Sequence, residues 1–132
     1  KILYDKMKNW EDVYFVYGET PTKTREQIRA LVEDAQNSII LASYGTFSTG
    51  INIRNINNIV FASPSKSKIR VLQSIGRGLR RSDSKMGVRL FDLSDDFKQS
   101  PKQNYTLSHF TTRLNIYAEE EFDYEISRIK LK

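Results

Sequence analysis

The chain has 132 residues, 39% of them hydrophobic and 28% charged, with a formal net charge of +5 at pH 7. This length suits a single domain with a substantial core. The absence of cysteine excludes disulfides and cysteine-ligated metals. A single histidine argues against a structural zinc site. No run approaches the roughly 18 apolar residues of a membrane span and no signal-peptide pattern occurs, so we expect a cytoplasmic protein with no membrane partner and no metal ligands of its own.

The first third of the chain predicts helix, strand and helix. Residues 2–7 are a helix-like run. The sequence begins at Lys1 without an initiator methionine, which indicates a fragment of a longer protein. Residues 13–17 are β-prone, and Gly18 ends this strand. Helix-start signals in residues 20–27, including a capping-box spacing that begins at Thr24, predict a helix that runs to about residue 36. Its predicted inward face consists of Ile28, Leu31, Val32 and Ala35.

Strands and helices continue to alternate downstream. Residues 38–42, SIILA, are a continuous apolar run typical of a strand buried on both faces. Residues 58–62 and 88–93 are also predicted strands, with a basic helix between them. A polar, turn-rich stretch then ends the alternating unit, and residues 105–121 predict a helix. Residues 122–131 alternate partly like a last strand.

This alternation predicts an α/β fold with a mainly parallel sheet. In such sheets, ligands bind beyond the carboxyl ends of the strands. Three loops leave those ends, at residues 18–24, 43–52 and 63–68. The second loop is rich in small hydroxyl residues and glycines, which suit contact with a sugar-phosphate backbone. The alternative interpretation is an ordinary flexible connection.

The aromatic residues divide into expected core residues and expected contacts. The core group consists of Tyr14, Phe15, Tyr17, Phe91 and Phe122. Tyr44 and Phe47 lie in the second loop and are candidates for exposed contact with bases. We interpret His109 as a packed or surface histidine, because no nucleophile or metal partner accompanies it.

The predicted helix between the third and fourth strands has one basic face. At about 100° per residue, this face consists of Lys66, Arg70, Gln73, Arg77 and Arg80. The opposite face consists of Ile69, Leu72, Ile75 and Leu79. Guanidinium groups one turn apart suit bidentate contact with phosphate oxygens, and Gly76 and Gly78, which weaken a helix, indicate close approach of a ligand or another backbone. The alternative is a solvated basic surface.

Charge is concentrated in the same region. Residues 66–89 contain eight basic residues and one acidic residue, a net charge of +7, so the rest of the chain is slightly negative. A basic patch on one element predicts a polyanionic partner, either a nucleic acid or a nucleotide.

Three motifs resemble those of the superfamily-two helicases. QSIGRGLR at 73–80 matches the Q-x-x-G-R-x-x-R motif VI, ASYGTFSTGIN at 42–52 looks like motif V, and YFVYGET at 14–20 resembles motif IV. Their details, together with an HF-x-x-R-x-x-x-Y tail at 109–117, are most similar to recombination helicases of T4-type phages. The resemblance implies the second RecA-like domain over residues 1–95, with its first strand missing, and a C-terminal extension over residues 96–132.

The resemblance also implies roles for the motif residues. Arg77 and Arg80 would reach the γ-phosphate of ATP, and Asn52, where the family usually carries Asp, would lie near the ribose. The remaining ATP-site residues would be Gln73, Gly76 and Gly50. Contacts with the nucleic-acid backbone would come from Gly18, Ser43, Thr46, Ser48, Thr49, Lys66 and Lys68.

The sequence lacks the parts that would hold ATP by itself. It contains no G-x-x-x-x-G-K-[ST] loop and no acidic Mg²⁺ motif. ATP and Mg²⁺ would therefore be held mainly by an N-terminal RecA-like domain of the same protein, and the chain alone is expected neither to hydrolyse ATP nor to unwind DNA. Branched or single-stranded DNA is the expected partner, in recombination or repair. The alternatives are a non-enzymatic nucleic-acid-binding module and a duplex-DNA translocase that does not separate strands.

Overall fold

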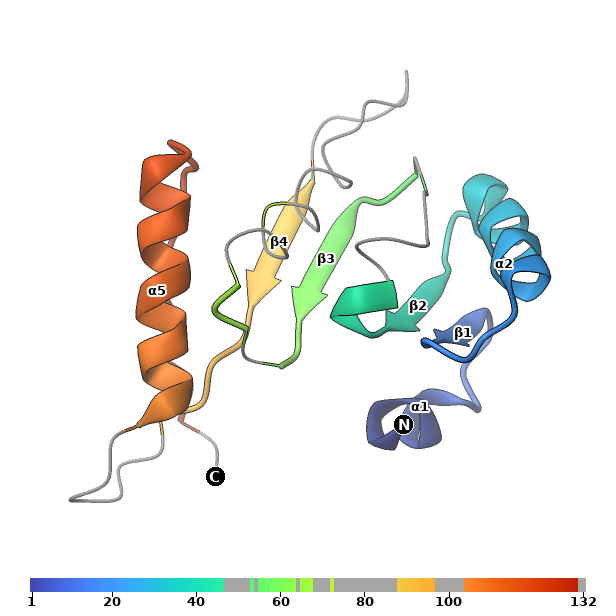
Figure 1. Ribbon diagram of the computed structural model, residues 1–132, viewed down its shortest axis with the longest axis horizontal. Coiled ribbons are helices and arrows are strands. Elements are labelled where there is room, and N and C mark those ends of the chain that lie inside the picture. The colour runs from blue at the N-terminus through green and yellow to red at the C-terminus, as the bar shows by residue number, and fades with distance from the viewer. Residues whose placement is uncertain are drawn as a thin grey trace.

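The structure is a computed structural model that describes residues 1–46, 53, 55–63, 65–67, 72, 88–96 and 104–130. The helices and strands, in chain order, are α1 (Ile2–Met7), β1 (Val13–Val16), α2 (Thr22–Asp34), β2 (Ile39–Ala42), β3 (Asn58–Phe61), β4 (Arg89–Asp92) and α5 (Tyr105–Glu119). The strands occupy the middle of the molecule, with α2 beyond β1 and α5 beyond β4 (Figure 1). Among the described residues, no helix is long and apolar enough to cross a membrane.

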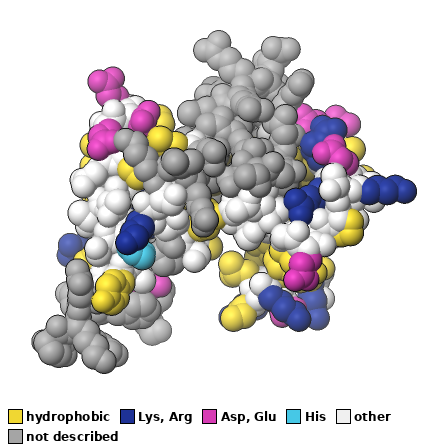
Figure 2. All heavy atoms as spheres, in the orientation of Figure 1, with side chains coloured by type: hydrophobic (Ala, Val, Ile, Leu, Met, Phe, Trp, Pro, Cys, Tyr) yellow, Lys and Arg dark blue, Asp and Glu magenta, His cyan; other side chains and the backbone are white. Residues whose placement is uncertain are grey.

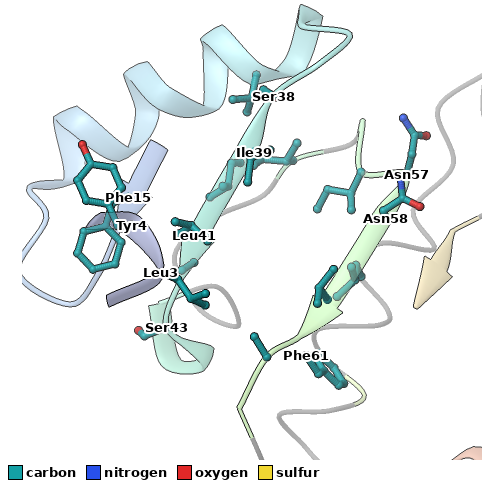
Figure 3. Close-up of a pocket in the computed structure, with 18 of the residues that line it drawn as sticks. Leu3, Tyr4, Phe15, Ser38, Ile39, Leu41, Ser43, Asn57, Asn58 and Phe61 are labelled. Atoms are coloured by element: carbon teal, nitrogen blue, oxygen red, sulfur yellow. The ribbon is translucent and has the colours of Figure 1, made fainter. Parts of the chain in front are cut away.

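The four strands in the described part of the chain form two parallel pairs. β1 pairs with β2 in a register that sets Val16 opposite Ala42, and β3 pairs with β4 so that Phe61 lies opposite Asp92. The parallel direction confirms the prediction, but within the described residues β2 and β3 are not hydrogen-bonded to each other. A groove of about 850 Å³, lined by residues of α1, β2 and β3, lies between them (Figure 3). Paired strands lie only about 4.8 Å apart, which leaves no room for a groove between them. The groove therefore separates β2 from β3 and divides the predicted sheet into two parts.

Each strand pair has its own hydrophobic cluster. Val16 of β1, Val32 of α2 and Ile53 form the first cluster. The second joins Ile59 and Phe61 of β3 to Tyr117 of α5. The C-terminal helix therefore shares a hydrophobic cluster with β3, against which Leu90 of β4 also packs.

α2 differs from its prediction in both its start and its inward face. Its N-cap is Pro21 and no side chain caps it, so the predicted capping box is wrong. The helix ends at Asp34 because the backbone of Ala35 is extended. Val32 is buried as predicted, but Leu31 is 60% exposed, because the helix packs on β1 along a narrower stripe than the apolar pattern covers.

Other expectations about burial also change. β2 is half-buried, not buried on both faces, since one of its sides borders the groove. Two aromatic residues expected in the core, Tyr17 and Phe91, are 41% and 43% exposed. Phe91 lies on the exposed face of β4, whose residues alternate between exposed and half-buried, and Tyr17 directly follows β1 with its ring stacked on that of Phe15.

Residues 122–130 do not form the predicted last strand. α5 ends at Glu119, and the described residues after Phe122 have no strand pairing and are exposed. The helix closes in a Schellman motif: the N–H of Phe122 donates to the carbonyl of Tyr117, and the N–H of Glu121 donates to that of Ala118. This turn directs Phe122 onto the second hydrophobic cluster, that of Ile59, Phe61 and Tyr117, called the β3–α5 cluster below.

Candidate nucleic-acid and nucleotide interface

The carboxyl ends of β1 and β2 bring two of the predicted contact loops together. The register that sets Val16 opposite Ala42 places the next residues, Tyr17 and Ser43, at neighbouring positions. Gly18 is exposed, and a Cβ added there would meet no atom within 4 Å. The glycine is therefore not required by packing within the described chain, and an outside backbone has room to approach it.

The first of these loops is held by an arginine that sequence reasoning missed. Nε of Arg25 donates to the carbonyl of Thr20 at 2.8 Å, and its Nη2 donates to that of Gly18 at 2.7 Å. The N–H of Tyr17 donates to the Thr20 hydroxyl at 3.0 Å. The available signal was the position of Arg25 in the first turn of the helix, close enough to reach back to the preceding loop.

Ser43 and Thr46 begin the second loop and contact each other. Their hydroxyl oxygens share a hydrogen bond of 2.8 Å, and the N–H of Thr46 donates to the Ser43 hydroxyl at 3.3 Å. Ser43 is exposed, whereas Thr46 is only 5% exposed. Ser43 therefore faces solvent while Thr46 holds the turn, and the nucleic-acid contacts assigned to both stay predictions.

Tyr44 connects the second loop to the third. Expected as an exposed contact, it is half-buried instead, with its ring centroid 5.4 Å from that of Phe61. Its hydroxyl donates to the carbonyl of Ser63 at 2.7 Å. Burial raises the pKa of Tyr44, so the phenol remains a hydrogen-bond donor at neutral pH.

The third loop is anchored from its other side by α5. Arg113, which is fully buried, donates from Nε and Nη2 to the two carboxylate oxygens of Asp92, each at 2.7 Å. Its Nη1 donates to the carbonyl of Ser65 at 3.1 Å. The Tyr117 hydroxyl also donates to Asp92, at 2.8 Å. A single guanidinium thus joins the helix, the end of β4 and the segment that follows β3.

Electrostatic interactions within this network keep the Arg113 guanidinium charged although it is buried. Burial lowers the pKa of Arg113, but its hydrogen bond and attraction to Asp92 outweigh that effect, so the net pKa is raised. Burial and then the negative charge of Asp92 raise the pKa of Tyr117. Arg113 therefore stays a cation and Tyr117 stays protonated across the physiological range.

The sequence carried a signal for this network without identifying its function. Arg113 and Tyr117 are four residues apart on a predicted helix, hence on one face, and both belong to the HF-x-x-R-x-x-x-Y tail. Asp92 lies near the carboxyl end of a predicted strand, the end at which α/β sheets bind ligands. Nothing in the sequence pattern, however, indicated that these three residues meet.

All of the predicted ATP-site residues lie outside the described residues. These are Gln73, Gly76, Arg77, Arg80, Gly50 and Asn52, and the same holds for the nucleic-acid candidates Ser48, Thr49 and Lys68 and for Phe47. Lys66 is described and exposed. Figure 2 shows acidic and basic side chains intermixed over α2, in agreement with the lower net charge outside residues 66–89.

His109 and the acidic residues form no metal site in the described part of the chain. The Nδ1 atom of His109 is buried and has no hydrogen-bond partner among these residues. No group of three or more histidine, cysteine, aspartate or glutamate side chains gathers there in a way that would hold a metal ion.

Comparisons with known proteins agree with this fold and with the family resemblance of the motifs. The helicase conserved C-terminal domain family matches residues 1–82. The chain is 41% identical over 99% of its length to the ATP-dependent DNA helicase uvsW of Enterobacteria phage T4, of which it covers 28%. It is also 30% identical, over 59% of its length, to the putative ATP-dependent helicase IRC3 of Saccharomyces cerevisiae, of which it covers 11%. The chain thus spans less than a third of the length of either relative.

Solved structures agree with the sequence matches. The crystal structure of T4 UvsW superposes with a TM-score of 0.70 at 41% identity, over 93% of this chain and 27% of that one. The C-terminal part of the Fun30 ATPase domain gives a TM-score of 0.59 at 15% identity over 89% of this chain and 43% of that one, which shows the fold alone. The chain therefore belongs to the helicase conserved C-terminal domain family, has the RecA-like α/β fold of that family and is related to the T4 helicase.

Proposed function

We propose that this chain is the C-terminal motor domain of an ATP-dependent superfamily-two DNA helicase or translocase that acts in recombination or repair. One observation carries the proposal: the loops after β1 and β2, which contain the motif IV-like and motif V-like residues, meet at the carboxyl edge of parallel strands. This edge is where α/β sheets bind ligands. The similarity to the T4 helicase over nearly the whole chain supports the same function.

In this proposal the exposed edge contacts the backbone of branched or single-stranded DNA. Gly18 offers an open approach and Ser43 an exposed hydroxyl, to which Lys66 adds positive charge beyond β3. Contacts with phosphate and sugar position a protein on a strand without reading its sequence. A motor that moves along any sequence requires such contacts.

In this proposal ATP binds between two domains, and each domain contributes part of the binding site. Arg77 and Arg80 reach the γ-phosphate, and Gln73, Gly76, Gly50 and Asn52 line the same site, while an N-terminal RecA-like domain holds most of ATP and Mg²⁺. The described residues include no cluster of metal ligands and so do not fit Mg²⁺. Arginines positioned at a transferring phosphoryl group contribute about 10³–10⁵ in rate.

Replacing Arg80 by alanine tests the motor function against a purely nucleic-acid-binding one. In the helicase that carries this chain with its ATP-binding domain, Arg80→Ala should lower kcat for ATP hydrolysis by about 10³-fold and change DNA affinity little. Arg89→Ala is the matched control, since Arg89 belongs to the same basic segment but is exposed at the amino end of β4.

A different outcome would favour the binding module. Unchanged ATP hydrolysis, weaker DNA binding and a salt dependence reduced by about one unit of slope would make Arg80 a phosphate contact only. If ATP hydrolysis falls as expected, strand displacement measured beside translocation on duplex DNA separates a helicase from a translocase that leaves strands paired.

A further inference from the structure

The segment between β3 and the arginine-rich stretch is held at two carbonyl groups. The Tyr44 hydroxyl, from the motif V-like loop, donates to the carbonyl of Ser63, and Arg113 of α5 donates to that of Ser65. Lys66 follows directly, and it is the first residue of the predicted basic face that includes Arg77 and Arg80. The start of that face is thus fixed to two other parts of the fold.

The chemistry of Arg113 is specific to this arrangement. A guanidinium has five N–H donors in one plane, so it is able to satisfy both oxygens of Asp92 and a carbonyl at the same time. The side chain is fully buried, and its guanidinium carbon, Cζ, also lies 5.9 Å from the centroid of the Phe110 ring. Lysine lacks this planar fork and, placed at the same position, would not reproduce all three hydrogen bonds.

We propose that α5 is a positioning element for the ATP-facing arginines, acting through the bond from Arg113 to Ser65. By fixing where the chain leaves β3, the C-terminal extension sets where Arg77 and Arg80 lie relative to the γ-phosphate. The inference rests on the proposed motor function. Arg113 is accordingly a positioning residue, and it has no contact with ATP or DNA in this scheme.

Two variants of the helicase with its ATP-binding domain separate positioning from stability. The triple variant Asp92→Leu, Arg113→Met, Tyr117→Phe replaces the polar network by apolar groups, a change that often leaves stability unchanged or higher. Arg113→Lys is the milder variant, because it retains the charge beside Asp92. The triple variant loses the bond to Ser65, and Arg113→Lys cannot make that bond together with both bonds to Asp92.

The expected result is a split between kinetic constants. With thermal unfolding within a few degrees of the parent, kcat for ATP hydrolysis falls by about 10- to 100-fold, since a displacement of about 1 Å has an effect of this size. KM for ATP and the dissociation constant for single-stranded DNA stay within about twofold of the parent, because the groups that bind ATP and DNA are unchanged. Arg29→Gln, which removes a partly exposed arginine paired with Glu26 on α2, is the control and should leave kcat unchanged.

Other outcomes overturn the inference. A stably folded variant of either kind with the parent's kcat shows that the network does not position the arginines. Unfolding of both variants also contradicts it, because α5 would then be needed for stability alone. Arg80→Ala measured in parallel distinguishes the two failures: if that variant also keeps full kcat, the proposed motor function is wrong, whereas if it loses kcat, only the role of α5 is.

Discussion

Arg113 and Asp92 show how one ion pair determines local structure at the scale of single residues. Moving each charge out of water costs several kcal/mol, and only good geometry with further hydrogen bonds offsets that cost. Here Asp92 accepts three hydrogen bonds, two from Arg113 and one from Tyr117, and Arg113 gives a third bond to Ser65. Removing one partner alone typically destabilises a protein by about 3–5 kcal/mol, so the network specifies one arrangement of β4, α5 and the segment after β3.

Tyr117 makes stability sensitive to alkaline pH. Its pKa is raised in the folded chain by burial and by Asp92, whereas a phenol in an unfolded chain ionises near pH 10. Above about pH 10 the unfolded chain loses this proton first, so the free energy of unfolding should fall as pH rises and should be unaffected below pH 9. Urea unfolding of the chain at pH 8, 10 and 11 measures this change.

Tyr117→Phe should reduce that alkaline loss of stability. Some of it should remain, because burial also raises the pKa of Tyr44, and Tyr44→Phe is therefore the companion variant. Equal losses in the parent and in both variants would mean that neither phenol is linked to unfolding.

At the scale of elements, α5 is defined at both ends by specific hydrogen bonds. The side-chain oxygen of Asn104 accepts from the N–H of Leu107 at 3.3 Å and caps the first turn. At the other end Glu121 has φ of 56°, in the left-handed region that favours glycine. The helix ends there because Phe122 gains contact with the β3–α5 cluster, although the backbone of Glu121 is strained.

Replacing Glu121 by glycine should therefore stabilise the chain. A left-handed residue with a Cβ costs about 1–2 kcal/mol, and the greater freedom of glycine in the unfolded chain removes about 0.4–1 kcal/mol of that gain. The expected net increase in the free energy of unfolding is about 0.5–1 kcal/mol. Glu120→Gly is the control: its φ is −91°, so it should be neutral or destabilising. Chemical denaturation measures both, and a loss of stability in Glu121→Gly would contradict the role of strain.

At the scale of the whole molecule, two clusters organise two strand pairs on either side of a groove. The pairing of β1 with β2 places the loops after these strands side by side, and the second cluster places α5 against β3 and β4. Tyr44 crosses between them through its bond to Ser63. The candidate nucleic-acid edge and the start of the basic segment are thus connected by one tyrosine and one arginine.

The proposed division of the ATP site between two domains leads to a prediction for the chain as a whole. The isolated chain should hydrolyse ATP no faster than background, because its sequence contains no phosphate-binding G-x-x-x-x-G-K-[ST] loop. Joining it to an ATP-binding RecA-like domain should produce DNA-stimulated hydrolysis, which a coupled phosphate-release assay measures. Substantial turnover by the isolated chain that disappears in Arg80→Ala would contradict this division.

Local patterns were sufficient for part of this structure. Val13–Val16, Asn58–Phe61 and Arg89–Asp92 lie inside their predicted strands, and α5 begins at the predicted Tyr105, because short β-branched runs and helix-start residues act within a few positions along the chain. The motifs were likewise enough to identify the family. Sequence pattern failed at Leu31, Tyr17 and Phe91, since periodicity shows which side chains are apolar but not how much of each face a neighbour covers.

The amino-acid order alone thus determined the alternation of strands and helices, the family and the concentration of positive charge in residues 66–89. Only the tertiary structure decided that Arg25 holds the first loop, that Tyr44 packs inward and that Arg113 joins Asp92 to Ser65. Arg113 and Ser65 are 48 residues apart in the chain. Bonds of this kind depend on how distant elements pack, and no local rule of spacing or propensity contains that information.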